Sequence, residues 1–555
     1  MRFSVHVAAL AAACVTASAA AVAQTPRVFT HADTLRGSNT PGRAWWDAGF
    51  YDLHVQVNPA DSSIAGRNTI VYRVLQPAAE MQIDLQVPLE VDSIVQHADR
   101  LTWRRDGNAF FVTLAAAQRA GSQDSLTVWY HGRYVRAPGD TTRRPIGPFH
   151  WAVDSAGAPW IATSNEGPGA STWWPLKDLP ADEPDSQRIA ITVPDPMIDV
   201  SNGRLRSTTH NPEGTTTFEW FVANPINSYD VAVNASPAYV PLRDEFKGAR
   251  GPLTIEFWAL APHREAAAAL IPQAKAMLSC FEHWFGPYPW YTDGYKLIEV
   301  PYLGMEHQSG IAYGNRYLPG YLGRDLSGTG EGLTWDYIVV HESAHEWWGN
   351  SISAKDHADM WIHESFGMYS EALWLECQKG KAAAERYLVG VRRMIRNDMP
   401  IIGTYGVNDT PRSQDRYPKG ANMLMTMRAV VDNDGRWLAT LRGLNSTFAH
   451  QTVTAKDIRD YMSKSTRTDL SRIFVQYQET TKIPVLEYRF DGKQLSYRWT
   501  NVVDGFAMPV RVGVAAEGYR RVRPTSEWQS VRSRLAPGTV LRIDPAFYVT
   551  AQPAT

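Results

Sequence analysis

The chain has 555 residues and a formal net charge of −2 at pH 7, with 44% hydrophobic and 20% charged residues. The absence of any long run of one charge sign argues against binding to nucleic acid or to an anionic membrane surface. A chain of this length exceeds what one hydrophobic core can hold, so we expect about two to four domains.

The first 23 residues have the features of a secretory signal peptide. Arg2 supplies a positive charge, residues 7–15 form an apolar run, and Ala21-Val22-Ala23 has the small-x-small form of a cleavage site. We therefore expect export to the periplasm or the medium. No later stretch reaches about eighteen uninterrupted apolar residues, so we expect no stable membrane insertion of the mature chain.

Two cysteines, Cys280 and Cys377, follow the signal segment and limit the possible cross-links. Two cysteines cannot form a disulfide framework of the kind that small secreted domains use. They can form one bridge in an oxidising compartment, or they can remain as two buried free thiols. The sequence leaves both alternatives open.

Residues 24–245 have the pattern of a large antiparallel β domain. Residues 51–57 alternate between apolar and polar side chains, and similar runs follow at 69–75, 80–87 and 125–130. Asp, Ser, Gly and Pro separate these runs, as expected for turns between strands. No helical period in this region is long enough to compete with that assignment.

Helical periodicity dominates residues 246–483, which we predict to be a mainly α domain. Apolar residues recur at helical spacing over residues 265–284, and Gly286-Pro287 ends that helix. Further helices are predicted at residues 359–377, 382–396 and 419–432, and a strand is predicted at 296–300.

Alternation returns in residues 484–555, where runs at 495–499, 510–514 and 540–543 predict a small β-sandwich. The predicted architecture is therefore multidomain α+β, with an N-terminal antiparallel β domain, a mainly α domain and a C-terminal β-sandwich. Of these three parts, the mainly α domain carries the residues with the clearest chemistry.

That domain contains His341-Glu342-Ser343-Ala344-His345, followed after eighteen residues by Glu364. Two His at positions i and i+4 point from the same face of a helix, and Glu342 lies between them where it can act as a base. Residues 335–340 contain no Pro or Gly and Gly349-Asn350 is a typical helix end, so we place the motif on a helix. The competing interpretation, two buried histidines with ordinary hydrogen bonds, requires the pattern to arise by chance.

Two His and one Glu form a known catalytic ligand set for zinc, with the fourth position left for water. We therefore predict that His341, His345 and Glu364 bind one Zn²⁺. His363 is expected to miss the metal, because adjacent residues on a helix point about 100° apart. Glu371, seven residues beyond Glu364, either orients a metal-bound His or is an ordinary polar residue of the helix.

The predicted ligand set is suited to amide hydrolysis, because zinc lowers the pKa of water and polarises a carbonyl group. In this scheme Glu342 takes the proton of the water and passes it to the leaving amine. A developing oxyanion also needs a donor beside the metal, and a Tyr hydroxyl is suited to that role.

Five short segments, in order, resemble the gluzincin aminopeptidase family, the relatives of aminopeptidase N and leukotriene hydrolase. They are Phe285–Trp290, Gly304-Met305-Glu306, the zinc motif with its eighteen-residue gap, Trp361–Glu364 and Tyr417–Gly420. The resemblance covers residues 50–555. It implies a thermolysin-like catalytic domain and a zinc-dependent aminopeptidase that acts on peptide substrates.

The same resemblance implies roles for individual residues. Tyr417 would stabilise the tetrahedral intermediate, and Glu306 and Glu166 would bind the free α-amino group of the substrate. Gly304 and Met305 would supply backbone contacts to the substrate. Two carboxylates that anchor an ammonium group hold the first peptide bond over the metal, so an exopeptidase is expected.

The chain also departs from the family's usual pattern. His307 and His363 stand where the relatives commonly have Asn, and the usual Ala before Met305 is replaced by Gly304. Many relatives carry a large helical C-terminal domain, whereas a small β domain is predicted here, so we expect a more open cleft.

Two alternative functions remain open from the sequence. The first is hydrolysis of a non-peptide substrate, such as an epoxide or an ester, by the same zinc site. The second is a peptide-binding protein that retains zinc without turnover. Intact Glu342 and Tyr417 argue against the second alternative, because both residues serve turnover rather than binding.

Overall fold

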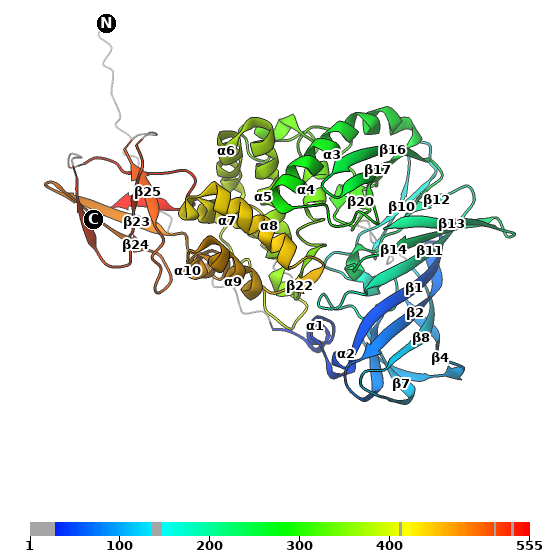
Figure 1. Ribbon diagram of the computed structural model, residues 1–555. Coiled ribbons are helices and arrows are strands. Elements are labelled where there is room, and N and C mark those ends of the chain that lie inside the picture. Colours follow the sequence, from blue (N-terminus) through cyan, green and yellow to red (C-terminus); the bar gives the residue numbers. More distant parts are fainter. Residues whose placement is uncertain (1–27, 135–146, 410–412, 515–517, 534–537, 555) are drawn as a thin grey trace, which may run out of the picture.

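A computed structural model describes residues 28–134, 147–409, 413–514, 518–533 and 538–554. The predicted signal peptide, residues 1–23, lies outside these described residues. Figure 1 shows three parts in a row: β strands in blue to cyan, helices in green to yellow, and a small β region in orange to red. Among the described helices, none is both long enough and apolar enough to cross a membrane.

An eight-stranded sheet forms the centre of the N-terminal β domain, in the order β13-β14-β11-β1-β2-β8-β4-β5. Neighbouring strands are antiparallel, as predicted, except that β1 and β11 run parallel. Alternate residues of β1, including Leu53, Val55 and Val57, are buried, which is why the period-two pattern identified this strand. The strands are β1 (Trp46–Asn58), β2 (Ser63–Val74), β4 (Glu90–Gln96), β5 (Asp99–Arg100), β8 (Gln123–Arg133), β11 (Ser186–Pro194), β13 (Arg204–Asn211) and β14 (Thr215–Val222).

Two smaller sheets belong to the same domain. One has the order β3-β7-β6 and the other the order β12-β15-β10-β9. Their strands are β3 (Ala78–Asp84), β6 (Thr102–Asp106), β7 (Ala109–Gln118), β9 (Phe149–Val153), β10 (Pro159–Thr163), β12 (Ile198–Val200) and β15 (Asn234–Ser236). Strand β10 leads directly into residues 164–169, the loop that carries Glu166.

Two short helices, α1 (His31–Gly37) and α2 (Pro41–Ala44), precede the first strand. Neither helix was predicted, because each is too short to show helical periodicity. Their ends are nevertheless well specified. Thr30 and Asp33 form a reciprocal capping box at the start of α1, and Pro41 occupies the first turn of α2.

A five-stranded sheet, β16-β17-β18-β20-β19, lies beside the helices. Its strands are β16 (Tyr239–Gly248), β17 (Gly251–Leu260), β18 (Tyr295–Glu299), β19 (Gly304–Met305) and β20 (Ile311–Tyr313). The predicted boundary at residue 245 falls inside β16, so this sheet begins before the boundary. The boundary was missed because alternation along one strand does not show which strand it pairs with, and β16 pairs with β17.

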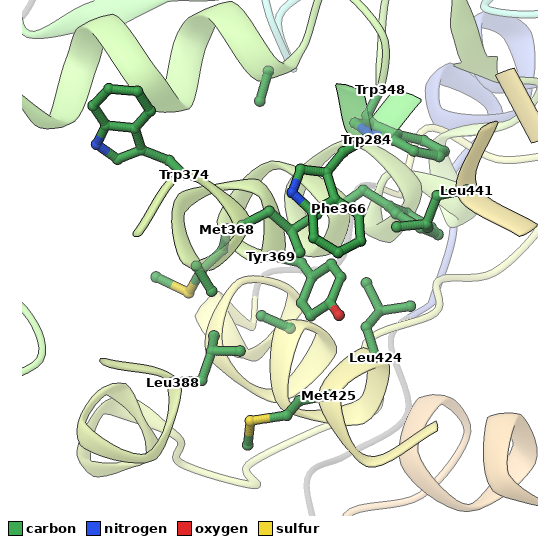
Figure 2. Close-up of a cluster of buried hydrophobic side chains, with 14 of the residues drawn as sticks. Trp284, Trp348, Phe366, Met368, Tyr369, Trp374, Leu388, Leu424, Met425 and Leu441 are labelled. Atoms are coloured by element: carbon green, nitrogen blue, oxygen red, sulfur yellow. The ribbon is translucent and has the colours of Figure 1, made fainter. Parts of the chain in front are cut away.

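The central domain is mainly helical. Its helices are α3 (Arg264–Phe285), α4 (Tyr337–Ala344), α5 (Trp361–Lys379), α6 (Lys381–Val391), α7 (Pro418–Val431), α8 (Asp434–Thr447), α9 (Ala455–Thr466) and α10 (Ser471–Gln478). Helix α5 runs through the core, and its residues 361–375 are all buried. Figure 2 shows side chains of α5 packed among neighbouring elements, with Phe366 stacked on Trp348 at 4.1 Å between ring centroids. Two short strands, β21 (Ile352–Ala354) and β22 (Gln451–Val453), pair in parallel.

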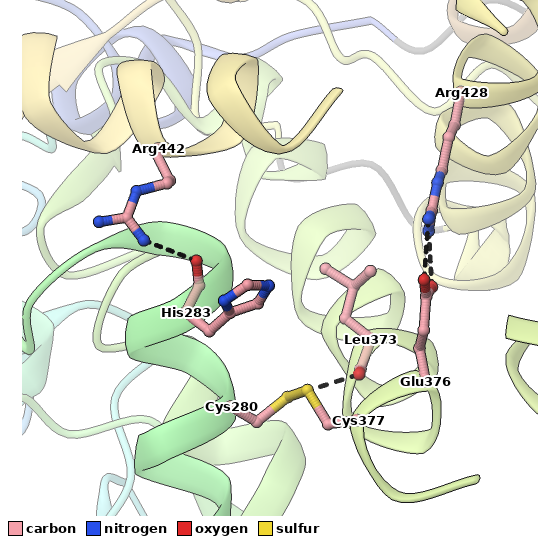
Figure 3. Close-up of a disulfide and its surroundings, with 7 residues drawn as sticks. All are labelled: Cys280, His283, Leu373, Glu376, Cys377, Arg428 and Arg442. Carbon is pink, nitrogen blue, oxygen red and sulfur yellow. Dashed lines mark hydrogen bonds and ion pairs between the residues drawn. A yellow bond between two sulfur atoms is a disulfide. The ribbon is translucent and has the colours of Figure 1, made fainter. Parts of the chain in front are cut away.

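The two cysteines form a disulfide, which decides the alternative that the sequence left open. Figure 3 shows the bridge between Cys280 of α3 and Cys377 of α5. Because α5 also carries Glu364, the bridge joins the helix of the predicted third metal ligand to α3.

The C-terminal strands form two small sheets, β27-β24-β23-β29 and β26-β25-β28. They are β23 (Val485–Asp491), β24 (Gln494–Thr500), β25 (Val510–Gly513), β26 (Arg520–Val522), β27 (Gln529–Arg532), β28 (Arg542–Ile543) and β29 (Thr550–Pro553). Buried residues of both sheets, such as Trp499 and Val510, belong to the same hydrophobic cluster as the helices. This region is therefore packed against the helical domain.

Candidate active site

The predicted zinc motif lies on α4. The side chain of Asp336 caps the first turn, and the helix ends at Ala344, earlier than the end predicted at Gly349. After Ala344, the first N–H groups bond to carbonyl oxygens three residues back, and those of residues 350–352 bond to oxygens five residues back. The regular helical hydrogen-bond pattern therefore ends at Ala344, although no Pro or Gly stands there. His345 keeps helical backbone angles, φ −64° and ψ −20°, and its side chain stays beside that of His341.

Three buried side chains bring their donor atoms to one point. The Nε2 atoms of His341 and His345 are 3.4 Å apart, and Glu364 Oε2 lies 3.8 Å from each of them. Tetrahedral ligands about 2.1 Å from a zinc ion are about 3.4 Å apart, so these donors have a spacing that suits zinc. The residues present therefore fit the predicted metal, and they form a group within metal-binding distance.

Outer hydrogen bonds fix which nitrogen of each His faces the metal. Nδ1 of His341 lies 2.7 Å from Glu371 Oε1, and Nδ1 of His345 lies 2.9 Å from the carbonyl oxygen of Trp348. Because both oxygens accept hydrogen bonds, each Nδ1 carries the proton and each Nε2 presents a lone pair. Glu371 therefore orients His341, and Tyr387 donates its hydroxyl to the other oxygen of Glu371.

Glu342 lies between the two His, close to the edge strand β19. A Cβ atom at Gly304 would lie 3.0 Å from Glu342 Oε1, so a glycine lets the strand approach this carboxylate. Burial raises the pKa of Glu342 to about 8, against the opposing charge of His341. A bound divalent cation would favour the charged form and oppose that rise. A carboxylate that titrates near neutrality suits a group that takes up and returns a proton.

Glu306 is held by two neighbours that sequence analysis did not place. The hydroxyl of Tyr229, from the N-terminal domain, donates to Glu306 Oε1 at 2.7 Å. His363 Nε2 accepts the N–H of Ala354, so its Nδ1 carries the proton and faces the same Glu306 oxygen at 3.4 Å. His363 therefore supports Glu306 and stays out of the ligand set, as predicted.

Glu166 reaches the same site from the loop at residues 164–169. Its Oε1 lies 4.0 Å from Arg416 Nη2. Burial and the nearby charges of Glu306 and Glu364 raise the pKa of Glu166 well above its usual value. A positive group beside this carboxylate would lower its pKa and stabilise its charged form, and a substrate ammonium is such a group.

Tyr417 lies at the start of α7 and donates its hydroxyl to Glu364 Oε1. Its ring is stacked near that of His341, at 5.9 Å between centroids. The residue before it, Arg416, was missed by sequence analysis. Arg416 Nη2 lies 3.4 Å from Glu364 Oε1 and 3.5 Å from the Tyr417 hydroxyl. The sequence signal that could have identified Arg416 is its position next to Tyr417.

A cavity of about 420 Å³ connects these groups. Its polar part is lined by Glu166, Glu306, His341, Glu342, Glu364 and Tyr417. Its apolar part is lined by Leu303, Met305, Tyr321, Leu326, Ile338, Met368 and Met394. The predicted site residues from both domains, Gly304 included and His345 excepted, thus line one cavity.

Comparison with known families agrees with this arrangement. Residues 271–477 match the Peptidase family M1 domain, and residues 48–229 match the Peptidase M1 N-terminal domain. The chain belongs to peptidase family M1. The resemblance to gluzincin aminopeptidases is thereby confirmed, and this family implies zinc as the metal.

Individual M1 relatives are distant. Aminopeptidase B of Mus musculus is 23% identical over 439 residues, which cover 73% of this chain and 62% of the relative. Probable aminopeptidase 1 of Sulfurisphaera tokodaii is 23% identical over 278 residues, 45% of this chain and 34% of the relative. The chain thus spans about a third to just under two thirds of the length of these curated relatives.

Solved structures show that the M1 fold is shared. An M1 zinc metallopeptidase from Deinococcus radiodurans has a TM-score of 0.64 and 20% identity, over 81% of this chain and 98% of its own. A mutant of a Deinococcus radiodurans M1 zinc metallopeptidase bound to a Tyr-Ser-Ala substrate has a TM-score of 0.65, with the same identity and coverage.

Two further features of the chain are its N-terminal helices and the buried residue His307. Helices α1 and α2 lie before residue 48, where the match to the N-terminal domain begins. His307, in place of the common Asn, is fully buried, and neither ring nitrogen has a hydrogen-bond partner within the part of the chain that the structure describes. Burial lowers the pKa of His307 to about 3, so its ring is neutral at pH 7.

Proposed function

We propose that this M1 chain is a zinc-dependent aminopeptidase that removes N-terminal residues from peptides, with one Zn²⁺ bound by His341, His345 and Glu364. The observation that carries the proposal is the meeting of Glu306 and Glu166, two carboxylates from different domains, at the cavity beside the metal donors. Two carboxylates attract a positively charged ammonium group, whereas a blocked amino terminus carries no positive charge for them to attract.

The residues of the chain divide the reaction between them. Zinc, when bound, supplies Lewis-acid chemistry and lowers the pKa of water. Glu342 takes the proton of the attacking water on its carboxylate and returns it to the leaving amine. Tyr417 donates its hydroxyl to the substrate oxygen as negative charge develops there. Glu306 and Glu166 hold the ammonium group, which places the first peptide bond beside Glu342.

Strand β19 supports backbone contacts from Gly304 and Met305. It is the edge strand of the five-stranded sheet and pairs with β20 on one side. An edge strand can accept an extended peptide as an additional strand. We therefore infer that the substrate backbone lies along Gly304 and Met305.

A panel of aminoacyl chromogenic substrates, assayed with and without a chelator, tests the proposal. We expect cleavage that a chelator abolishes and Zn²⁺ restores, and no cleavage of the N-acetylated form of the same substrate. Equal cleavage of free and acetylated forms would remove Glu306 and Glu166 from their roles. Turnover of epoxides or esters alone would favour the non-peptide hydrolase, and zinc binding without turnover would favour the binding protein.

We further propose that the chain is exported to the periplasm or the medium. The disulfide between Cys280 and Cys377 supports this, since such bonds persist in oxidising compartments. Cell fractionation of the full-length chain tests the location. We also infer that the two C-terminal sheets form the expected β-sandwich and that the helical domain is thermolysin-like.

A further inference from the structure

Helix α1 carries an arginine, Arg36, that contacts the loop of Glu166. Its Nη1 donates to the carbonyl oxygen of Gly167 at 2.8 Å, and its Nε donates to Asp178 Oδ2 at 3.2 Å. The side chain is largely buried, with 12% of its surface exposed. The Gly167 carbonyl is adjacent to Glu166 in the chain, so the guanidinium binds the loop one residue away from that carboxylate.

The same guanidinium reaches the helical domain. Its Nη1 also donates to Asn408 Oδ1 at 3.1 Å, and the N–H of Asn408 donates to the carbonyl oxygen of Asp33 at 2.9 Å. Gly37 lies so close that an added Cβ would be 2.0 Å from Asn408 N. Figure 1 shows α1 where the N-terminal strands meet the helical domain. Helix α1 therefore joins the Glu166 loop to a segment of the other domain.

Asp178 gives the arginine a fixed anchor. Ser171 donates its hydroxyl to Asp178 Oδ2 at 2.5 Å. Burial alone would raise the pKa of Asp178, but Arg36 and Ser171 hold it below its usual value, so the carboxylate is charged. A Cβ at Gly169, where φ is 89°, would lie 2.2 Å from Arg36 Nη2, so the loop is closely fitted to the arginine.

We propose that Arg36 is a positioning residue for Glu166, and that α1 sets the distance between the two domains at the amine-binding site. The inference rests on the proposed aminopeptidase function, in which Glu166 binds the substrate ammonium. Without the donor at the Gly167 carbonyl, the loop has two glycines at positive φ and fewer contacts to keep Glu166 directed at the cavity. Helix α1 lies before residue 48, where the match to the Peptidase M1 N-terminal domain begins.

The variant Arg36→Lys tests the role. Lysine keeps the charge beside Asp178 but lacks the planar fork that holds several acceptors at once. We expect KM for a free aminoacyl substrate to rise about 3- to 10-fold, the factor for loss of about one hydrogen bond. We expect kcat to stay within about 2-fold, since the ammonium is held equally in the ground and transition states. Circular dichroism and zinc content should match the parent protein.

Two further variants make the test specific. Arg104→Lys is the matched control, because Arg104 forms an exposed ion pair with Glu80 on the same domain, and it should change nothing. In a Glu166→Gln background, Arg36→Lys should add little, since both changes act on one group. Additive losses, or a fall in kcat with unchanged KM, would overturn the inference.

If the Arg36→Lys variant does not fold, the Asn408→Ala variant tests the inference instead. It removes the side-chain acceptor that Arg36 uses in the helical domain, while the backbone hydrogen bond from Asn408 to Asp33 and the pair of Arg36 with Asp178 remain. A rise in KM of about 2-fold supports the inference, and unchanged kinetics overturn it. An inactive parent protein would refute the proposed function and this inference with it. An active parent protein whose KM is insensitive to both variants refutes this inference alone.

Discussion

The active site has two halves that are built in different ways. The metal half, His341, His345 and Glu364, stands on or at the ends of α4 and α5, two buried helices of one domain. The amine half, Glu166 and Glu306, lies on a loop and beside an edge strand of two different domains. A helix fixes side chains four residues apart by itself, whereas groups on separate domains meet when both domains have folded. The residues proposed to bind the metal thus come from one domain, whereas the residues proposed to bind the amino terminus come together when two domains assemble.

The strongest test of the metal half is Glu342→Gln. We expect kcat to fall by roughly 10²- to 10⁴-fold, because the amide cannot take the proton of water. Zinc content and thermal stability should stay near those of the parent protein. Steady-state kinetics with metal analysis would check this. Full activity in this variant would contradict the assignment of Glu342 as the base.

A smaller effect is expected for Glu371→Gln, which weakens the orientation of His341. Zinc affinity should fall about 10- to 100-fold, as is usual when a group behind a metal-binding His is changed. Competition with a chelator measures this affinity. The matched control is Glu376→Gln on the same helix, which contacts Arg428 and should leave zinc affinity unchanged. Equal affinities of both variants would show that Glu371 has no such role.

The smallest effect is expected for Tyr229→Phe, which tests the amine half. Loss of the hydroxyl removes a donor from Glu306, so KM for free aminoacyl substrates should rise by up to about 10-fold. Zinc affinity and kcat should change little. Kinetics with free and N-acetylated substrates would check this. A loss of zinc in this variant would show that the residues around Glu306 also support the metal site, and it would contradict the separation of the site into two halves.

The metal half was predicted from the sequence because its information is local. The spacing of His341 and His345 follows from helix geometry, and the alternation in β1 follows from strand geometry. Glu364 lies on another helix, α5, and was predicted because two His and one Glu form a known zinc ligand set. Glu371 stayed open, since periodicity places a residue on a face but does not choose its partner. The early end of α4 was missed because no Pro or Gly marks it.

The supports of the amine half were not predicted because their partners are far apart in sequence. Glu166 and Glu306 came from the family resemblance, while Tyr229 and Arg36 were missed. Tyr229 contacts a residue 77 positions away, and Arg36 contacts residues 131 and 372 positions away. No spacing rule connects such positions, and α1 is too short to show a period.

The bridge between Cys280 and Cys377 has a consequence for how the metal is retained. It closes a loop of 97 residues, and His341, His345, Glu364 and Glu371 all lie inside that loop. In the chain-entropy account, a loop of about 100 residues restricts the unfolded state by about 4.7 kcal/mol. The three proposed metal ligands and Glu371, which contacts His341, thus remain within one disulfide-closed loop even when the protein is unfolded. We therefore expect formation of the disulfide and retention of zinc to be linked through the unfolded state, where the ring limits how far the proposed ligands can separate.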